Sequence, residues 1–226
     1  MSLIVKICGL STPEALDVAL EEHADMVGFV FFPPSPRNLS FDSARALRGR
    51  VKGRAKKVAL SVDADDALLS AIVDALDPDF LQLHGKESPE RVAAIKARFR
   101  LPAIKALAIE TKADFTRVKD YAAVSDWLLF DAKAPAEATR PGGLGRPFDW
   151  SLIRGVVPGV PVMLSGGLDA SNVEEAMRIT GLPAVDVSSG VESLPGRKDV
   201  RKIREFIRRA RQAYLEARAD SVVSNA

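Results

Sequence analysis

The single cysteine and one aspartate stand at the ends of two predicted strands, where they could perform acid–base chemistry. Cys8 ends the apolar run over residues 3–8, and Asp131 ends the run over residues 127–131. A carboxyl group at an apolar mouth has a raised pKa and can act as a general acid near neutral pH. An ordinary thiol is only about 3% ionised at neutral pH, so Cys8 needs nearby positive charge to act as a base or nucleophile.

Both residues also have a structural interpretation. A lone cysteine is more often a small core residue than a reactive one, and an aspartate at a strand end is often a helix cap or turn residue. Lys6 shares the strand face of Cys8 and could raise the positive potential there or pair with an inward carboxylate such as Asp186, which we favour. A Gly-rich segment, rather than a helix, follows Asp131, and this favours a functional role for that residue.

Three further polar residues stand near predicted strand ends. Gln82 and His84 share one face at the end of the run over residues 80–83, where substrate contact is favoured over the satisfaction of core polar groups. Arg37 lies in the Pro-rich segment 32–38. A guanidinium held by a stiff loop is suited to binding a carboxylate, although a solvated surface arginine is the alternative.

Three Gly- and Ser-rich segments follow the last three predicted strands. In chain order they contribute Gly142, Gly143 and Gly145, then Ser165, Gly166 and Gly167, then Ser188, Ser189 and Gly190. Backbone N–H groups of such turns can approach an anion closely. In barrels of parallel strands, the loops after strands seven and eight are a frequent phosphate site. The first segment is longer and is typical of a lid.

Short apolar runs alternate with amphipathic runs along the whole chain, which predicts repeated βα units. The predicted strands cover residues 3–8, 26–31, 57–62, 80–83, 103–107, 127–131, 160–164 and 184–188. Helices are expected to start near Pro13, Phe41, Pro89 and Val173, after capping residues, and to cover residues 64–76, 112–123, 150–155 and 199–215.

The 226 residues divided by eight units give about 28 residues per unit, close to a compact βαβ step. No linker divides the chain, so we expect a single-domain (β/α)8 TIM barrel over residues 1–215 and a frayed tail over residues 216–226. A doubly wound open sheet is the alternative. It is disfavoured because no G-x-G-x-x-G segment follows the first strand.

Composition excludes several function classes. Charged residues make up 27% of the chain, hydrophobic residues 47%, and the net charge is +2, so neither nucleic acid nor an anionic membrane is an expected partner. One cysteine and two histidines allow no internal disulfide and no standard zinc site, which favours a cytoplasmic, metal-independent protein. The basic run 201–209 is interpreted as the solvated side of the last helix, because Ile203, Phe206, Ile207 and Ala210 share one face.

An ordered set of motifs covers nearly the whole chain. The segments KICG (6–9), SPR (35–37), QLHG (82–85), FDAK (130–133), GGLG (142–145), LSGGL (164–168) and VDVSSGVE (185–192) resemble the phosphoribosylanthranilate isomerase family of tryptophan biosynthesis. The resemblance implies a (β/α)8 barrel and an Amadori rearrangement of an aminoaldose to an aminoketose, without metal or organic cofactor. Leu144 departs from the threonine usual in the family, which puts a side-chain hydrogen bond from that position in doubt.

The resemblance also implies roles for the residues above. Asp131 would be the general acid that protonates the furanose ring oxygen, and Cys8 would be the general base that removes the proton from ribose C2. Arg37 would hold the anthranilate carboxylate, and the loops after strands seven and eight would hold the phosphate. Gln82 and His84 would line the pocket.

Other functions are weighed against this one. A dual-specificity isomerase that also serves histidine biosynthesis should show two similar halves in its sequence and an aspartate near the end of strand one, where this chain has Cys8. Indole-glycerol-phosphate synthase requires a different set of lysine and glutamate residues. A catalytically silent phosphate-binding barrel would bind ligand without turnover. The expected partner is a small phosphorylated substrate, and the protein is expected to be a monomer or homodimer. Phe31 and Leu39 are taken as exposed apolar residues that could form an interface or pack on the substrate.

Overall fold

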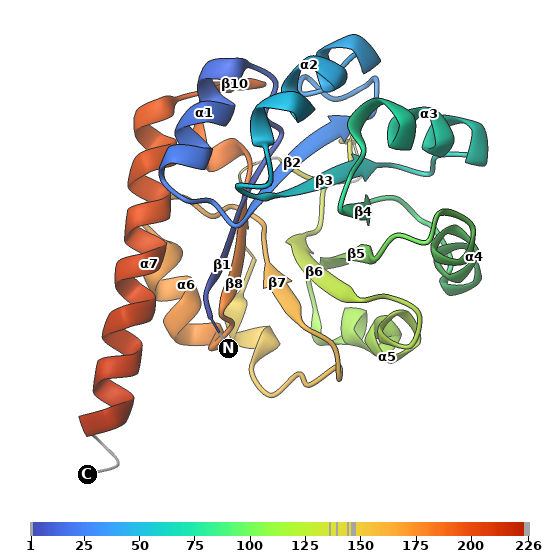
Figure 1. Cartoon of the computed structure of the whole chain (residues 1–226). Coiled ribbons are helices and arrows are strands. Elements are labelled where there is room, and N and C mark those ends of the chain that lie inside the picture. Colours follow the sequence, from blue (N-terminus) through green and yellow to red (C-terminus); the bar gives the residue numbers. More distant parts are fainter. Residues whose placement is uncertain (1, 136, 139, 144, 146–147, 224–226) are drawn as a thin grey trace.

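The structure is a computed structural model that describes residues 2–135, 137–138, 140–143, 145 and 148–223. Among these residues, eight parallel strands form one closed barrel in chain order (Figure 1). They are β1 (Ile4–Cys8), β2 (Met26–Phe31), β3 (Lys56–Ser61), β4 (Phe80–Leu83), β5 (Ala103–Ile109), β6 (Trp127–Ala132), β7 (Val162–Leu164) and β8 (Ala184–Val187). β8 pairs back onto β1, which closes the barrel. The predicted (β/α)8 architecture is confirmed.

Helices surround the barrel on its outer side (Figure 1). They are α1 (Pro13–Glu21), α2 (Phe41–Val51), α3 (Asp66–Leu76), α4 (Pro89–Phe99), α5 (Val118–Ala122), α6 (Val173–Thr180) and α7 (Val200–Val223). The side chains of Thr12, Ser40 and Ser88 each accept a hydrogen bond from the backbone N–H three residues later. These caps explain why α1, α2 and α4 begin where the sequence predicts.

Two of the predicted helices are 3-10 helices over part or all of their length. Residues 112–123 form a 3-10 helix, η1 (Lys112–Arg117), followed by the short α5. The helix expected over residues 150–155 is the single 3-10 turn η2 (Trp150–Ile153). The last helix is instead longer than predicted, because α7 continues past residue 215 to Val223 through alanine, glutamate and arginine, which are good helix formers.

A small hairpin follows β8 and was not predicted. The turn η3 (Ser189–Val191) leads into β9 (Glu192–Leu194), which pairs antiparallel with β10 (Arg197–Lys198). Gly196 in the connection has φ 83°. The Pro195–Gly196 dipeptide is a turn signal, but strands of two or three residues are too short to give a hydrophobic period. The hairpin carries Glu192 and Lys198 to the carboxyl end of the barrel.

Burial agrees with most of the sequence interpretation. Ile203, Phe206, Ile207 and Ala210 of α7 are buried, which confirms that the basic run is the solvated side of a packed helix. Phe31 and Leu39, by contrast, are buried, so the interpretation of both as exposed interface residues is wrong. Both belong to the main core cluster of strand and helix residues. No helix among the described residues has the length and apolar character needed to cross a bilayer.

Candidate active site

A pocket at the carboxyl ends of the barrel strands gathers the residues that the sequence singles out. Every predicted site residue except Gly190 lines it, with contributions from β1, β4, β6 and the loops after β2, β6, β7 and β8. Gly190 has a different position: a Cβ there would lie 2.0 Å from the carbonyl oxygen of Leu168. Glycine at this position therefore lets the loops after β7 and β8 approach each other, which keeps the two predicted phosphate loops together. Leu144 lies outside the described residues.

Asp131 lies near the end of β6 and contacts His84, which directly follows β4. His84 Nε2 lies 3.1 Å from Asp131 Oδ2, and His84 Nδ1 lies 3.0 Å from the side-chain nitrogen of Gln82. The backbone N–H of Ala132 donates to Asp131 Oδ1 at 2.9 Å. Asp131 is 5% exposed, so this hydrogen-bonded chain fixes the carboxyl group at the pocket wall. Gln82 and His84 thus position Asp131 as well as line the pocket.

The loop after β6 closes tightly over this chain of groups. A Cβ at Gly142 would lie 2.4 Å from Asp131 Oδ2 and 2.9 Å from His84 Nε2. Glycine at position 142 therefore allows the backbone to lie directly against the carboxyl group. The carbonyl of Gly143 accepts a hydrogen bond from Arg37 at 3.2 Å, which links the same loop to the residue predicted to bind a carboxylate.

Cys8 lies on β1 with its thiol buried at the pocket wall. The residue is 4% exposed, and its register partner on β2 is Gly28, where a Cβ would lie 2.9 Å from the sulfur. Lys6, on the same strand, donates to Asp186 Oδ1 at 2.7 Å, as favoured from the sequence. Ser165 also donates to Asp186, at 3.0 Å, which ties this buried pair to the loop after β7.

Burial raises the pKa of the Cys8 thiol above its ordinary value, and Asp186 adds to the effect, while Lys6 and Lys198 oppose it. We therefore expect the free protein to hold Cys8 as a thiol at neutral pH. Because Cys8 is the only cysteine, the ultraviolet absorbance of the thiolate reports it alone once the spectrum of a Cys8→Ala variant is subtracted. The midpoint should lie above the ordinary thiol range of about 8.5. A midpoint below that range would contradict the structural interpretation.

Arg37 is held by an acidic residue that sequence reasoning missed. Its Nε donates to Glu192 Oε1 at 2.7 Å and its Nη2 donates to Glu192 Oε2 at 2.8 Å, in a two-pronged ion pair. Both side chains are 4% exposed. The third nitrogen, Nη1, makes no hydrogen bond with any described residue, and Arg37 lines the pocket. Nη2 also donates to Gly143, so Nη1 is the guanidinium nitrogen left for a ligand carboxylate.

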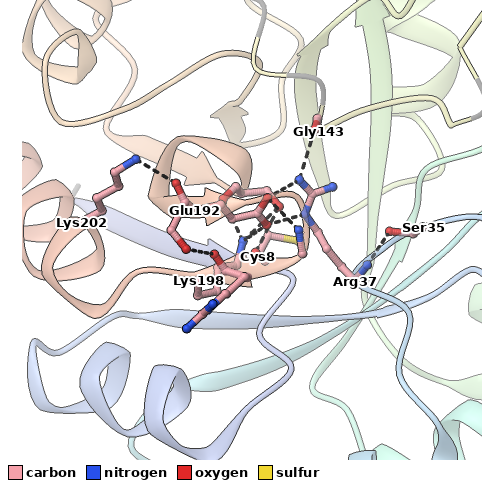
Figure 2. A network of polar contacts seen from close by, with 11 residues as sticks. Cys8, Ser35, Arg37, Gly143, Glu192, Lys198 and Lys202 are labelled. Carbon is pink, nitrogen blue, oxygen red and sulfur yellow. Dashed lines mark hydrogen bonds and ion pairs between the residues drawn. The ribbon is translucent and has the colours of Figure 1, made fainter.

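The Glu192 carboxylate also binds the hairpin that carries it (Figure 2). Lys198 donates to Glu192 Oε1 at 2.9 Å and to the backbone oxygen of Ser188 at 2.8 Å. Lys202 of α7 donates to the backbone oxygen of Glu192 at 2.8 Å. Arg37, Glu192 and Lys198 therefore connect the loop after β2 to the loop after β8. The signal that could have found Glu192 is the VE that ends the VDVSSGVE motif, but its partner lies 155 residues away in the chain.

A further buried ion pair holds the segment around His84. Lys105 of β5 is fully buried and donates to Glu87 Oε2 at 2.7 Å and to the backbone oxygens of Leu83 and Gly85 at 3.2 and 2.7 Å. Those two carbonyls flank His84. Among the described residues there is no cluster of three or more His, Cys, Asp or Glu side chains that could hold a metal ion.

A family model, a similar sequence and two similar structures all indicate the same enzyme family. The sequence model for N-(5'-phosphoribosyl)anthranilate (PRA) isomerase matches residues 5–209. An N-(5'-phosphoribosyl)anthranilate isomerase from Nitrobacter hamburgensis is 61% identical over 218 residues, which cover 96% of this chain and 97% of that protein. The crystal structure of phosphoribosyl anthranilate isomerase from Thermotoga maritima has 35% identity and a TM-score of 0.83, covering 93% of this chain and 99% of that one. Another structure of the isomerase, in complex with reduced 1-(o-carboxyphenylamino)-1-deoxyribulose 5-phosphate, has 33% identity, a TM-score of 0.79 and the same coverage.

Proposed function

The chain belongs to the N-(5'-phosphoribosyl)anthranilate isomerase family, and we propose that it carries out the family's reaction with Asp131 as general acid and Cys8 as general base. The protein is an aldose–ketose isomerase of tryptophan biosynthesis. Its substrate is an aminoaldose with a 5-phosphate and an anthranilate carboxylate. The observation that carries the two catalytic roles is that Cys8 and Asp131 line one pocket from β1 and β6, with polar groups for both anionic ends of the substrate around it.

The first step is the opening of the furanose ring. Asp131 gives its proton to the ring oxygen as the bond from C1 to that oxygen breaks, and the lone pair of the anthranilate nitrogen forms a C1=N bond. The product is a protonated Schiff base, and Asp131 becomes a carboxylate. Support comes from the position of Asp131 Oδ2, which faces the pocket beside His84 Nε2 at 3.1 Å and under Gly142. A positioned carboxyl group contributes about 100-fold or more to such a proton transfer.

The second step is the removal of the proton from C2. The sulfur of Cys8 takes this proton as thiolate, the electron pair forms a C1=C2 bond, and the C1=N bond returns to a single bond. The resulting enolamine becomes the ketone when C1 gains a proton and the C2 hydroxyl loses one. The protonated Schiff base is itself a positive charge near the buried thiol, and a nearby positive charge lowers a thiol's pKa. The base is therefore favoured at the stage of the reaction that needs it.

Two anion sites orient the substrate between the acid and the base. We assign the anthranilate carboxylate to Nη1 of Arg37, because Glu192 and Gly143 already bind Nε and Nη2. The phosphate belongs to the loops at Gly166 and Ser189, which both line the pocket. Backbone N–H groups in Gly/Ser turns after the last two strands of a barrel are suited to this role.

Replacing Glu192 by Gln should raise KM while changing kcat much less. The substitution keeps the shape of the side chain but removes the charge that fixes Nε and Nη2 of Arg37. We expect KM to rise about tenfold, equivalent to about 1.4 kcal/mol of binding. Steady-state kinetics measure both constants. The matched control is Glu22→Gln, which changes a similar two-pronged pair with Arg208 on the surface and should leave KM unchanged. Equal KM values for the Glu192 variant and wild type would refute this role of Glu192.

Conversion of phosphoribosylanthranilate by the purified protein tests the activity itself. The substrate's anthranilate fluorescence should be lost at a rate proportional to enzyme concentration. Absence of conversion above background, with the ligand still bound, would indicate a catalytically silent barrel.

An isomerase structure from Thermotoga maritima is described as a monomeric form of a dimeric enzyme, so this chain is proposed to be a monomer or homodimer. A cytoplasmic location is proposed because the only cysteine is a free buried thiol.

A further inference from the structure

The hairpin β9–β10 places a buried lysine beside the general base. Lys198 has a side chain that is 1% exposed, and its ammonium donates to the backbone oxygen of Ser188 at 2.8 Å and lies 3.3 Å from the Ser188 hydroxyl. That hydroxyl in turn donates to the backbone oxygen of Cys8 at 3.2 Å. The ammonium is therefore one side chain away from Cys8, and none of the steps described above uses it.

The charges around Cys8 show why this lysine is important. The charges that act on the thiol are those of Lys6 on β1, Asp186 on β8 and Lys198 on β10. Lys6 and Asp186 form an ion pair at 2.7 Å, so Asp186 offsets part of the positive charge of Lys6. The remaining pocket groups are the Asp131–His84 pair on the wall formed by β4 and β6, and the Arg37–Glu192 pair on the loops.

Arg37, Glu192 and Lys198 together carry one net positive charge, because a single carboxylate serves two cations. Figure 2 shows these three residues around Cys8, with Lys202 beyond Glu192. A buried site of low dielectric makes such an uncompensated charge effective over several ångströms. Burial lowers the pKa of Lys198 below its ordinary value and Arg37 adds to this, while the ion pair with Glu192 opposes it and favours the ammonium form.

We propose that Lys198 is a positioning residue of the catalytic site, whose ammonium fixes the Ser188 turn and supplies the net positive charge that favours the Cys8 thiolate. One group thereby serves two parts of the site. It holds the turn that is proposed to bind phosphate, and it stabilises the charged form of the base. The inference rests on the proposed role of Cys8, but it makes a claim about the thiol that can be measured without turnover.

The test is a titration of the Cys8 thiol in the Lys198→Met variant, in which ultraviolet absorbance measures the thiolate at each pH. The spectrum of the double variant Lys198→Met, Cys8→Ala is subtracted. An opposite charge within about 4–6 Å shifts a pKa by about one unit or more. We therefore expect the Cys8 midpoint to rise by about one pH unit. The control is Lys202→Met. Lys202 belongs to the same network, but its side chain is exposed and its ammonium donates to the backbone oxygen of Glu192. Its midpoint should equal that of wild type.

An unchanged midpoint in Lys198→Met, or an equal rise in Lys202→Met, would overturn the proposal. If Lys198→Met does not fold, Lys198→Gln gives the same test with a polar side chain that can still bond to the Ser188 backbone oxygen. Its Cys8 midpoint should likewise rise, and an unchanged or lowered midpoint would overturn the proposal. Failure of Cys8 as the base would instead appear as an active Cys8→Ala enzyme, which leaves the titration result standing. The two failures are therefore distinguishable.

Discussion

Asp131→Asn is expected to lower kcat by at least about 100-fold, the usual scale of general acid catalysis. The substitution keeps the size and planar shape of the side chain, so the amide oxygen can still accept from the N–H of Ala132, as Asp131 Oδ1 does at 2.9 Å. An amide, however, has no proton acidic enough to give to the ring oxygen. The loss should therefore fall on the chemical step, and steady-state kinetics with phosphoribosylanthranilate measure it.

The control for this variant is Asp42→Asn. Asp42 lies in the first turn of α2 with a side chain that is 94% exposed, far from the pocket lining. This change should leave kcat within about twofold of wild type, since surface substitutions usually cost less than about 0.5 kcal/mol. Thermal unfolding of both variants separates a catalytic defect from misfolding. An Asp131→Asn enzyme that folds and retains wild-type kcat would remove Asp131 from the mechanism.

Cys8→Ala should also lower kcat by at least about 100-fold, because it removes the group that takes the C2 proton. Asp186 also lines the pocket, but its two oxygens already accept from Lys6 and Ser165. Lys6 is fully buried and paired with Asp186 at 2.7 Å, so it does not replace the thiol. The variant removes one buried sulfur atom, a small cavity change that the barrel should tolerate at a cost of about 1–2 kcal/mol.

Cys8→Ser separates shape from acidity in the same position. A serine hydroxyl fits the space beside Gly28 but is far less acidic than a thiol, so this variant should be as impaired as Cys8→Ala. Thermal unfolding again checks the fold. Wild-type activity in either variant would refute the assignment of Cys8 as the base, while the family membership of the chain would stand.

Much of the barrel could be predicted because its signals are local. The strands read as short apolar runs, and the ranges of β2 and β4 are those predicted, since turn residues bound both. The fixed strand period also placed Gln82 with His84, and Cys8 with Lys6, on shared faces. Because all parallel strands end at one face of the barrel, residues at those ends meet even though Cys8 and Asp131 are far apart in sequence.

The parts that were missed depend on contacts between distant segments. Glu192 is recognisable as functional only through Arg37, and Lys198 only through Ser188 and Cys8, which three-dimensional packing brings together. The helix expected over residues 112–123 begins as a 3-10 helix over Lys112–Arg117, where Asp114 accepts from the N–H groups of Glu110 and Thr111. Sequence periodicity carries no information on such pairings.

The most direct test of the acid–base assignment measures binding and turnover on the same two variants. Asp131→Asn and Cys8→Ala are each titrated with reduced 1-(o-carboxyphenylamino)-1-deoxyribulose 5-phosphate, and their kcat values are measured with phosphoribosylanthranilate. If the two groups transfer protons, Kd should stay within about threefold of wild type, less than about 0.7 kcal/mol, while kcat falls at least about 100-fold. A loss of affinity as large as the loss of kcat, or wild-type turnover in either variant, would contradict the assignment.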